Sequence, residues 1–382
     1  MNHPLPRLQE EFSAKIPALT LLCNLGWTYL PPETINALRN GKTNLVVLHE
    51  ALRAILKKRR FTFEGKRHPL SDQAIDTILQ EVGQPALNEG LNLANEKMYN
   101  HLMYGVPVTE FIGGKKATPT IPLIDWNTPQ NNSFTFTEEY RVLANNGVDH
   151  RIPDIVCFVN GFPLVVIEAK RPDGHSRKTL TIDAGISQNL RNQRNDEIPQ
   201  LFAYSQLLLA VNGVEGRYAT QGTSKPFWAS WREEAFTENH CQQLKNKPVD
   251  PQQLQAIFQH RPADHEQWYE NLLAQGHLAV TEQDRLLISL LSPDRLLDIT
   301  RFAVLYDKKI GKIVARYQQY FGVRELIKTI NTRKPDGGRE GGVIWHTTGS
   351  GKSFTMVFLT KALILNDSLK NCRLARMLHK PS

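Results

Sequence analysis

The sequence has little cysteine, and it contains no long apolar run. Its four cysteines are scattered along 382 residues, which matches neither a disulfide framework nor the paired spacing of a zinc site. No run of eighteen apolar residues occurs, and the N-terminus lacks the apolar core of a signal peptide. These absences predict a soluble, cytoplasmic protein without a membrane partner. We also find no internal repeats.

What the sequence does contain is an ordinary globular composition with an excess of positive charge. Apolar residues make up 41% and charged residues 22%, which is typical of folded protein, and the length allows two or three domains. The net charge of +8 and the pI near 9.2 favour a polyanionic partner, although many basic soluble proteins share this balance.

The most informative stretch is residues 151–170 (RIPDIVCFVNGFPLVVIEAK). Two apolar, β-branched runs, 155–159 and 164–169, flank Asn160-Gly161. Asn-Gly between such runs is the strongest short-range signal for a β-hairpin. We therefore predict two antiparallel strands that end in charged residues.

The register of this hairpin decides whether its charges form a cluster. Side chains alternate along a strand, so Glu168 and Lys170 share one face. A three-residue loop over 160–162, or a bulge, places Asp154 opposite Glu168, whereas a two-residue loop places it opposite Ile167. A cluster thus requires an odd-length loop or a bulge.

Two facing carboxylates next to a lysine suit metal-dependent phosphodiester chemistry. Asp154 and Glu168 would repel each other unless a cation lay between them, and oxygen ligands favour Mg²⁺. Lys170 could orient water or stabilise charge on a phosphate. The alternative is an ion-pair ladder on a solvated face of the sheet. We favour the site because a strongly apolar run precedes Glu168.

Around the hairpin, the pattern predicts a mixed α/β core. Apolar periodicity indicates helices over 11–25, 34–57 and 71–103, and we interpret the basic stretch Lys57–Arg60 as a solvated turn rather than a phosphate contact. Short strands are expected on both sides of the hairpin. After it, Pro199 starts a helix that places Gln200 and Tyr204 one turn apart on one face.

The remainder of the chain predicts a connector followed by a nucleotide-binding segment. Residues 237–286 are polar and rich in glutamine, and they read as short helices at a domain seam. Further helices are expected over 286–305, with a turn at Pro293, and over 316–330.

A short apolar strand at 342–346 then leads into residues 347–353 (TTGSGKS) and an apolar helix over 354–365. This order of elements is typical of a phosphate-binding P-loop: a strand, then Gly-Ser-Gly-Lys-Ser, then a helix. In a P-loop the lysine reaches the phosphates and the serine holds Mg²⁺. His346 replaces the first glycine of the full pattern, which weakens the match little. The predicted phosphate-binding residues are Thr348, Gly349, Ser350, Gly351, Lys352 and Ser353. Only 29 residues follow Ser353, without an acidic strand, so the nucleotide site is expected to be half present.

Four motifs together resemble the restriction (motor) subunit of type I restriction–modification enzymes. The motifs are RIPD…LVVIEAKRP at 151–172, IPQLFAY at 198–204, RYQQYF at 316–321 and GGVIWHTTGSGKS at 341–353. The resemblance implies a PD-(D/E)xK nuclease core, a mixed sheet flanked by helices, followed by the start of a RecA-like helicase domain. It also implies Mg²⁺ and ATP as cofactors, double-stranded DNA as substrate, and the modification (methyltransferase) and specificity subunits as partners.

The resemblance also assigns residues. Asp154 and Glu168 match the metal ligands of the family, and Lys170 matches its catalytic lysine. Gln200 and Tyr204 match a motif thought to position DNA or the active site. Gln319 looks like the glutamine that reads adenine ahead of the P-loop. Such nucleases often add a glutamate from the first helix, for which Glu11, beside Glu10, is the candidate.

The expected organisation is a nuclease domain over 1–236, a helical connector over 237–286, an incomplete P-loop ATPase domain over 287–370, and a basic tail over 371–382. The family continues well beyond this length, so we expect a truncation, a frameshift product or an expressed fragment. Two other readings stay open: a remnant that binds DNA or subunits without regulated cutting, and the nuclease of another ATP-dependent helicase–nuclease system.

Overall fold

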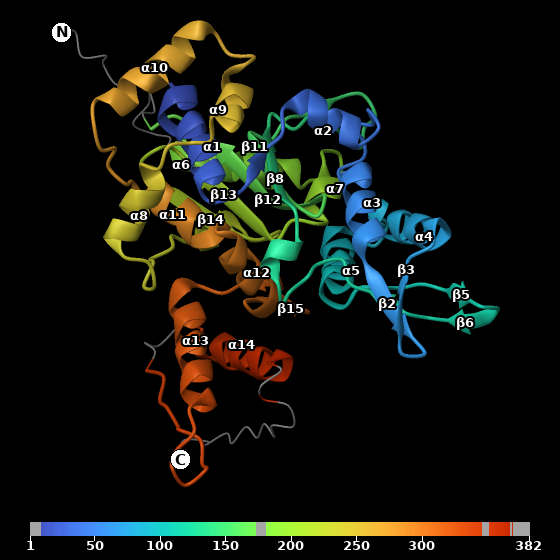
Figure 1. Cartoon of the computed structure of the whole chain (residues 1–382). Coiled ribbons are helices and arrows are strands. Elements are labelled where there is room, and N and C mark those ends of the chain that lie inside the picture. Colours follow the sequence, from blue (N-terminus) through green and yellow to red (C-terminus); the bar gives the residue numbers. More distant parts are fainter. Residues whose placement is uncertain (1–8, 173–180, 346–350, 367–368, 370–382) are drawn as a thin grey trace.

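The computed structural model describes residues 9–172, 181–345, 351–366 and 369. Within these ranges, no helix is both long enough and apolar enough to span a membrane. The described residues form a mixed α/β protein in which one central sheet is surrounded by helices, with a smaller helical segment below it (Figure 1).

The central sheet has six strands in the order β1-β8-β11-β12-β13-β14. Pairs β1–β8 and β12–β13 are parallel and the other neighbours are antiparallel, so the sheet is mixed as predicted. Every residue of the three central strands β11, β12 and β13 is buried. Its strands are β1 (Thr28–Tyr29), β8 (Phe134–Glu138), β11 (Ile155–Val159), β12 (Phe162–Ala169), β13 (Leu207–Val211) and β14 (Gly216–Ala219).

Helices cover this sheet from several parts of the chain. Helix α6 packs along β12 and β13, while α1 packs on α11, which contacts the edge strand β14. A π-helical turn, η1 (Glu11–Lys15), precedes α1. The helices are α1 (Ile16–Asn24), α2 (Pro32–Leu38), α3 (His49–Lys58), α4 (Asp72–Gly83), α5 (Leu91–Tyr104), α6 (Thr181–Asn192), α7 (Pro199–Phe202), α8 (Glu238–Lys245), α9 (Pro251–Phe258), α10 (Ala263–Ala274) and α11 (Glu282–Leu291).

Smaller strands and 3₁₀ turns complete this part. They form the hairpins β2–β3 and β5–β6 and the short pairs β4–β7 and β9–β10. Their bounds are β2 (Arg60–Phe63), β3 (Lys66–Pro69), β4 (Val106–Pro107), β5 (Glu110–Ile112), β6 (Lys115–Ala117), β7 (Thr120–Ile121), β9 (Val142–Leu143), β10 (His150–Arg151), η2 (Pro129–Asn131) and η3 (Lys225–Phe227).

Two of the predicted long helices are wrong, because each is broken. The helix expected over 34–57 splits into α2 and α3, since Asn40 and Gly41 adopt positive φ angles of 56° and 69° that end a helix. The helix expected over 71–103 splits into α4 and α5 around Gly90 (φ 95°). The turn expected at Lys57–Arg60 is also wrong: its first residues end α3 and its last begins β2.

Residues 237–286 do form short helices, α8 to α10, but they pack back onto the sheet domain. Helix α9 contacts β1, and α8 and α9 contact α1. The expected boundary at 286/287 falls within helix α11. The division into a nuclease domain, a helical connector and an ATPase domain stays a prediction, and α11 runs without interruption through the expected boundary.

The C-terminal segment consists of α12 (Pro293–Phe302), the hairpin β15 (Val304–Asp307) and β16 (Gly311–Val314), α13 (Tyr317–Asn331) and α14 (Lys352–Leu365). A buried lysine of β16, Lys312, connects this segment to the sheet domain. It donates hydrogen bonds to Ser205 O (2.8 Å) and Gln206 Oε1 (2.7 Å). Burial lowers the pKa of Lys312 well below its ordinary value.

The strand predicted at 342–346 is not observed. Residues 342–345 have no strand structure, His346 lies outside the described residues, and Val343 and Trp345 are each 92% exposed. An apolar strand of this kind needs neighbouring strands to satisfy its backbone and to cover its side chains. The described part of the chain places no such neighbour beside it.

Candidate active site

The β11–β12 hairpin combines a two-residue turn with a bulge. Asn160 (φ 53°) and Gly161 (φ 88°) form the turn, and Val159 pairs with Phe162. The register then shifts, because Leu164 is an extra residue of β12, and Cys157 pairs with Val165. The expected three-residue loop is wrong, and the alternative of a bulge is confirmed.

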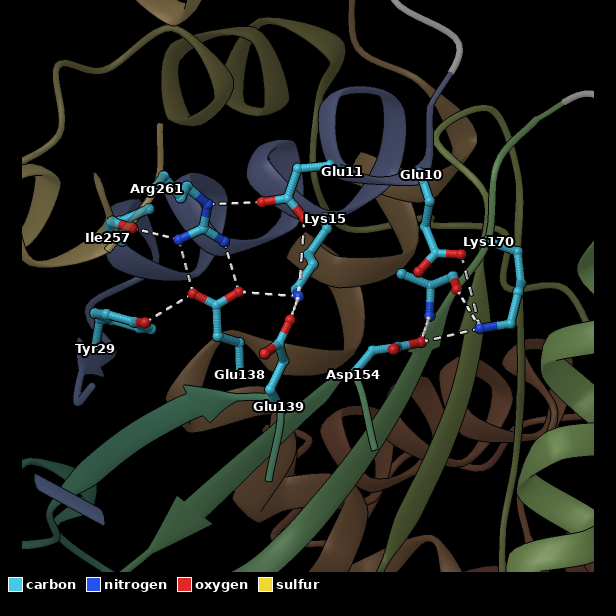
Figure 2. A network of polar contacts seen from close by, with 11 residues as sticks. Glu10, Glu11, Lys15, Tyr29, Glu138, Glu139, Asp154, Lys170, Ile257 and Arg261 are labelled. Atoms are coloured by element: carbon cyan, nitrogen blue, oxygen red, sulfur yellow. Dashed lines mark hydrogen bonds and ion pairs between the residues drawn. The ribbon is translucent and has the colours of Figure 1, made fainter. Parts of the chain in front are cut away.

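This register brings the predicted charges together. Ile155 pairs with Ile167, so Asp154 follows opposite Glu168. The Oδ2 atom of Asp154 accepts hydrogen bonds from Ala169 N (2.8 Å) and from Lys170 Nζ (3.1 Å). Lys170 Nζ also donates to Ala169 O at 2.6 Å. Figure 2 shows Asp154 and Lys170 facing each other at the end of these strands.

Glu168 is the member of the cluster that lacks a complete set of partners. Its side chain is fully buried; Oε1 accepts a long hydrogen bond from Asn192 Nδ2 (3.4 Å), and Oε2 has no hydrogen-bond donor in the described structure. Burial raises the pKa of Glu168 well above its ordinary value, and the negative charge of Asp154 raises it further. Ionised Glu168 therefore needs positive charge close by.

The donor atoms at this position fit a hard cation. Asp154 and Glu168 supply carboxylate oxygens and Ala169 supplies a backbone carbonyl, which are the ligand types that Mg²⁺ prefers. No group of three or more His, Cys, Asp or Glu side chains in the described ranges is arranged to hold a metal. A metal ion here would be held by the two carboxylates together with backbone oxygen or water, and this role of Asp154 and Glu168 stays a prediction.

The acidic residue of the first helix that reaches this cluster is Glu10. The Oε2 atom of Glu10 lies 3.9 Å from Lys170 Nζ. Burial raises the pKa of Glu10, and the positive charge of Lys170 partly offsets this rise. Glu11, the residue predicted for this role, instead lies 2.6 Å from Arg261 Nε. The π-helical turn beginning at Glu11 changes the phase of the side chains, and such turns are frequent at functional sites.

Beside the cluster lies a buried ion network that the sequence did not reveal (Figure 2). Arg261 binds both carboxylate oxygens of Glu138, and Lys15 binds Glu138 (3.1 Å) and Glu139 (2.8 Å). Tyr29 OH donates to Glu138 at 2.7 Å. Burial alone would raise the pKa of Glu138, but the hydrogen bonds from Arg261 and the charge of Lys15 hold it below its ordinary value. These residues come from distant segments, so no local pattern could have identified them.

Gln200 and Tyr204 do not lie one turn apart on a single helix. Helix α7 ends at Phe202, and Tyr204 follows in a turn. Gln200 Nε2 donates to Leu143 O (2.7 Å), and the fully buried Tyr204 OH donates to Val82 O (2.7 Å). Both side chains thus hold backbone segments of the sheet domain together, and their role at the site stays a prediction.

The predicted nucleotide residues are only partly described. Thr348, Gly349 and Ser350 lie outside the described residues. Gly351 (φ 82°) precedes α14, whose first residues, Lys352 and Ser353, are exposed.

Gln319 of α13 lies against this turn. Its Nε2 donates to Gly351 O (3.2 Å), and its Oε1 accepts from Arg316 N (2.9 Å). The structure thus places Gln319 beside the turn that precedes α14, and its role in reading adenine stays a prediction.

Comparisons with known proteins agree with these observations. Residues 7–227 match the family model "Type I restriction enzyme R protein N terminus", and residues 318–378 match the model "SWI2/SNF2 ATPase". The type I restriction enzyme HindI endonuclease subunit of Haemophilus influenzae is 30% identical over 368 residues, which cover 93% of this chain and 30% of that protein.

A protein of Methanocaldococcus jannaschii, whose name describes it provisionally as the endonuclease subunit of a type I restriction enzyme, is 25% identical over 378 residues. That alignment covers 97% of this chain and 33% of the relative. The chain thus spans about a third of the length of the curated relatives it matches.

Proposed function

The chain belongs to the family of the type I restriction enzyme R protein N terminus, and on that premise we propose that it carries the DNA-cutting centre of a restriction subunit. In this proposal the sheet domain is a PD-(D/E)xK nuclease that hydrolyses phosphodiester bonds of double-stranded DNA in the cytoplasm. The modification and specificity subunits of the same system are its expected partners, and translocation is a property of the full-length subunit.

The observation that carries the proposal is the cluster of Asp154, Glu168 and Lys170 at the end of a buried hairpin. Burying Glu168 costs free energy of folding, because its side chain is fully buried and one of its carboxylate oxygens lacks a hydrogen-bond donor. Asp154 and Glu168 would hold Mg²⁺, which when bound polarises a phosphoryl oxygen and lowers the pKa of coordinated water.

The other residues of the cluster position and neutralise charge. Lys170 lies 3.1 Å from Asp154 and is the ammonium that can approach a scissile phosphate and stabilise its developing negative charge. Glu10 lies on the far side of Lys170 and holds that ammonium between two carboxylates. The network of Lys15, Arg261 and Glu138 fixes the start of the first helix, and with it Glu10.

For the C-terminal segment we propose ATP binding at the turn before α14. Lys352 would contact the phosphates, Ser353 would hold Mg²⁺, and Gln319 would bind the adenine. The contact of Gln319 with Gly351 supports this assignment.

The nuclease proposal is tested by nicking of supercoiled plasmid in the presence of Mg²⁺. Asp154→Ala and Lys170→Ala are each expected to lower the rate by about a thousandfold, because each removes a charge at the reacting phosphate. Their melting temperatures should stay close to that of the wild type.

Matched controls are Asp76→Ala and Lys97→Ala, which remove an aspartate and a lysine from exposed ion pairs. Both should nick like the wild type. Unchanged nicking by Asp154→Ala or Lys170→Ala would refute the proposal.

A further inference from the structure

A pair of hairpins far from the cutting centre concentrates positive charge. Residues 57–69 contain six lysines and arginines against a single glutamate. They form the end of α3 and the hairpin β2–β3, and the hairpin β5–β6 lies beside them. Figure 1 shows both hairpins extending away from the central sheet. We call residues 57–69 and 110–117 the basic hairpin pair.

The carboxylates of the basic hairpin pair are already engaged. Glu64, in the turn of β2–β3, forms an ion pair with Lys115 at 2.7 Å, which joins the two hairpins near their tips. Glu110 is buried and accepts a hydrogen bond from Ser71 N at 2.8 Å, which joins them near their base. The two hairpins therefore form one unit with uncompensated positive charge.

Three of the exposed side chains that carry this excess charge lie on the strands of the two hairpins. Lys66, Arg67 and Lys116 are exposed, and none has an ion-pair partner among the residues that the structure describes. Arg67 lies diagonally across the hairpin from Arg60 on the face opposite the buried Phe61, so like charges lie close together.

The helix dipole accounts for only part of this charge. Lys57 and Lys58 lie in the last turn of α3, where basic residues stabilise the helix. Arg60 donates to the carbonyls of Lys57 and Arg59, which caps the same helix end. Lys66, Arg67 and Lys116 lie on strands and serve no such purpose.

The position of the basic hairpin pair is set by the same hairpin that carries the cutting centre. Leu48 N donates to Gly161 O (2.9 Å), so α3 begins beside the β11–β12 turn, at the end of β12 opposite Lys170. The eight residues of β12 separate the two ends by about 26 Å.

We propose that the basic hairpin pair binds the phosphate backbone of duplex DNA at a distance from the scissile bond. This inference rests on the proposed function, since it adds a second point of attachment for the same DNA. Attachment to phosphates carries no sequence information, and it fixes the duplex in place.

The test measures binding of a 30-bp duplex by fluorescence anisotropy in EDTA, so that no cutting occurs, between 50 and 200 mM salt. The double variant Lys66→Gln/Arg67→Gln should flatten the slope of log K against log salt by about 0.9 for each phosphate that is no longer neutralised, at most about 1.8, and weaken binding about tenfold. The charge-conserving variant Lys66→Arg/Arg67→Lys should keep the wild-type slope.

The matched control is Lys308→Gln/Lys309→Gln, which removes two exposed charges from the turn of another hairpin, β15–β16, and should leave the slope unchanged. Equal slopes for all variants would overturn the inference while leaving the proposed function intact. If Lys66→Gln/Arg67→Gln lost binding to poly-L-glutamate but kept wild-type binding to the duplex, the inference of DNA binding would be overturned in favour of an acidic protein partner. Absence of any duplex binding by the wild type would refute both proposals.

Discussion

The candidate cutting centre and the candidate nucleotide site differ in the structure that supports them. Asp154 and Lys170 end two central strands whose neighbours on both sides belong to the same sheet. Lys352 and Ser353 begin a helix, but residues 342–345 before it pair with no strand in the described ranges. The first site is therefore defined by geometry, and the second by its motif and by the contact of Gln319 with Gly351.

The difference also appears in how polar groups are satisfied. Around the cutting centre, buried charges such as Glu138 are paired with Lys15 and Arg261 from separate segments. At the candidate nucleotide site Lys352 is exposed, and Trp345, which precedes it in the chain, is 92% exposed. Substitutions should therefore have large effects at the first site and small ones near the second.

The largest effect within this comparison concerns the two glutamates of the first helix. Glu10→Ala is expected to lower Mg²⁺-dependent plasmid nicking by about tenfold to a hundredfold, because Glu10 positions Lys170. Glu11→Ala should keep nicking within about threefold of wild type and should lower the melting temperature, because Glu11 pairs with Arg261. The reverse pattern would restore Glu11 as the site residue.

The next effect concerns the ion network. Arg261→Ala leaves the buried Glu138 with fewer donors and is expected to cost about 3 kcal/mol of stability. The measurement is thermal or urea unfolding, with Lys97→Ala, from an exposed ion pair, as the control. Wild-type stability of Arg261→Ala would show that α8 to α10 are not held to the sheet domain by this residue.

A smaller effect follows from the raised pKa of Glu168. A raised pKa means that the folded state binds the proton of Glu168 more tightly than the unfolded state does. This proton binding stabilises the fold fully below about pH 4.5, and the stabilisation is lost as the pH rises through the folded-state pKa. Metal-free Glu168→Gln should therefore melt at a higher temperature than wild type at pH 8, and the difference should be smaller at pH 5. An equal difference at both pH values would contradict a buried, uncompensated carboxylate.

The smallest effect is expected at Trp345. Trp345→Ala should change the free energy of unfolding by less than about 0.5 kcal/mol, because its side chain is almost fully exposed. Trp27 is 2% exposed and donates to Leu291 O at 2.7 Å, so Trp27→Ala should cost about 3–5 kcal/mol. Similar destabilisation by the two substitutions would show that the segment before α14 is packed in solution.

Much of the central sheet could be predicted from sequence. The strand predicted at 155–159 matches β11, because its apolar run is buried on both faces. The helices predicted over 34–57 and 71–103 ran across Gly41 and Gly90, although glycine is a turn signal and both glycines adopt positive φ angles. The strand at 342–346 was over-predicted, because an apolar run specifies burial only where other strands are present to cover it.

The sequence predicted that the charged residues of the hairpin come together, but not how they do so. Asp154, Glu168 and Lys170 followed from alternation along the hairpin, yet the bulge at Leu164 depends on packing that the sequence does not display. That Glu10 rather than Glu11 contacts Lys170 depends on a π-helical turn that helical periodicity cannot reveal.

The central claim is that Asp154 and Glu168 hold a divalent cation, and calorimetric titration with Mg²⁺ tests it most directly. Wild type is expected to bind Mg²⁺ with release of protons and with affinity that rises with pH, because Glu168 must ionise to become a ligand. Asp154→Asn, which keeps the shape of the side chain and removes its charge, should weaken binding by at least about tenfold. Equal Mg²⁺ affinity for wild type and Asp154→Asn, with no proton release, would contradict the account.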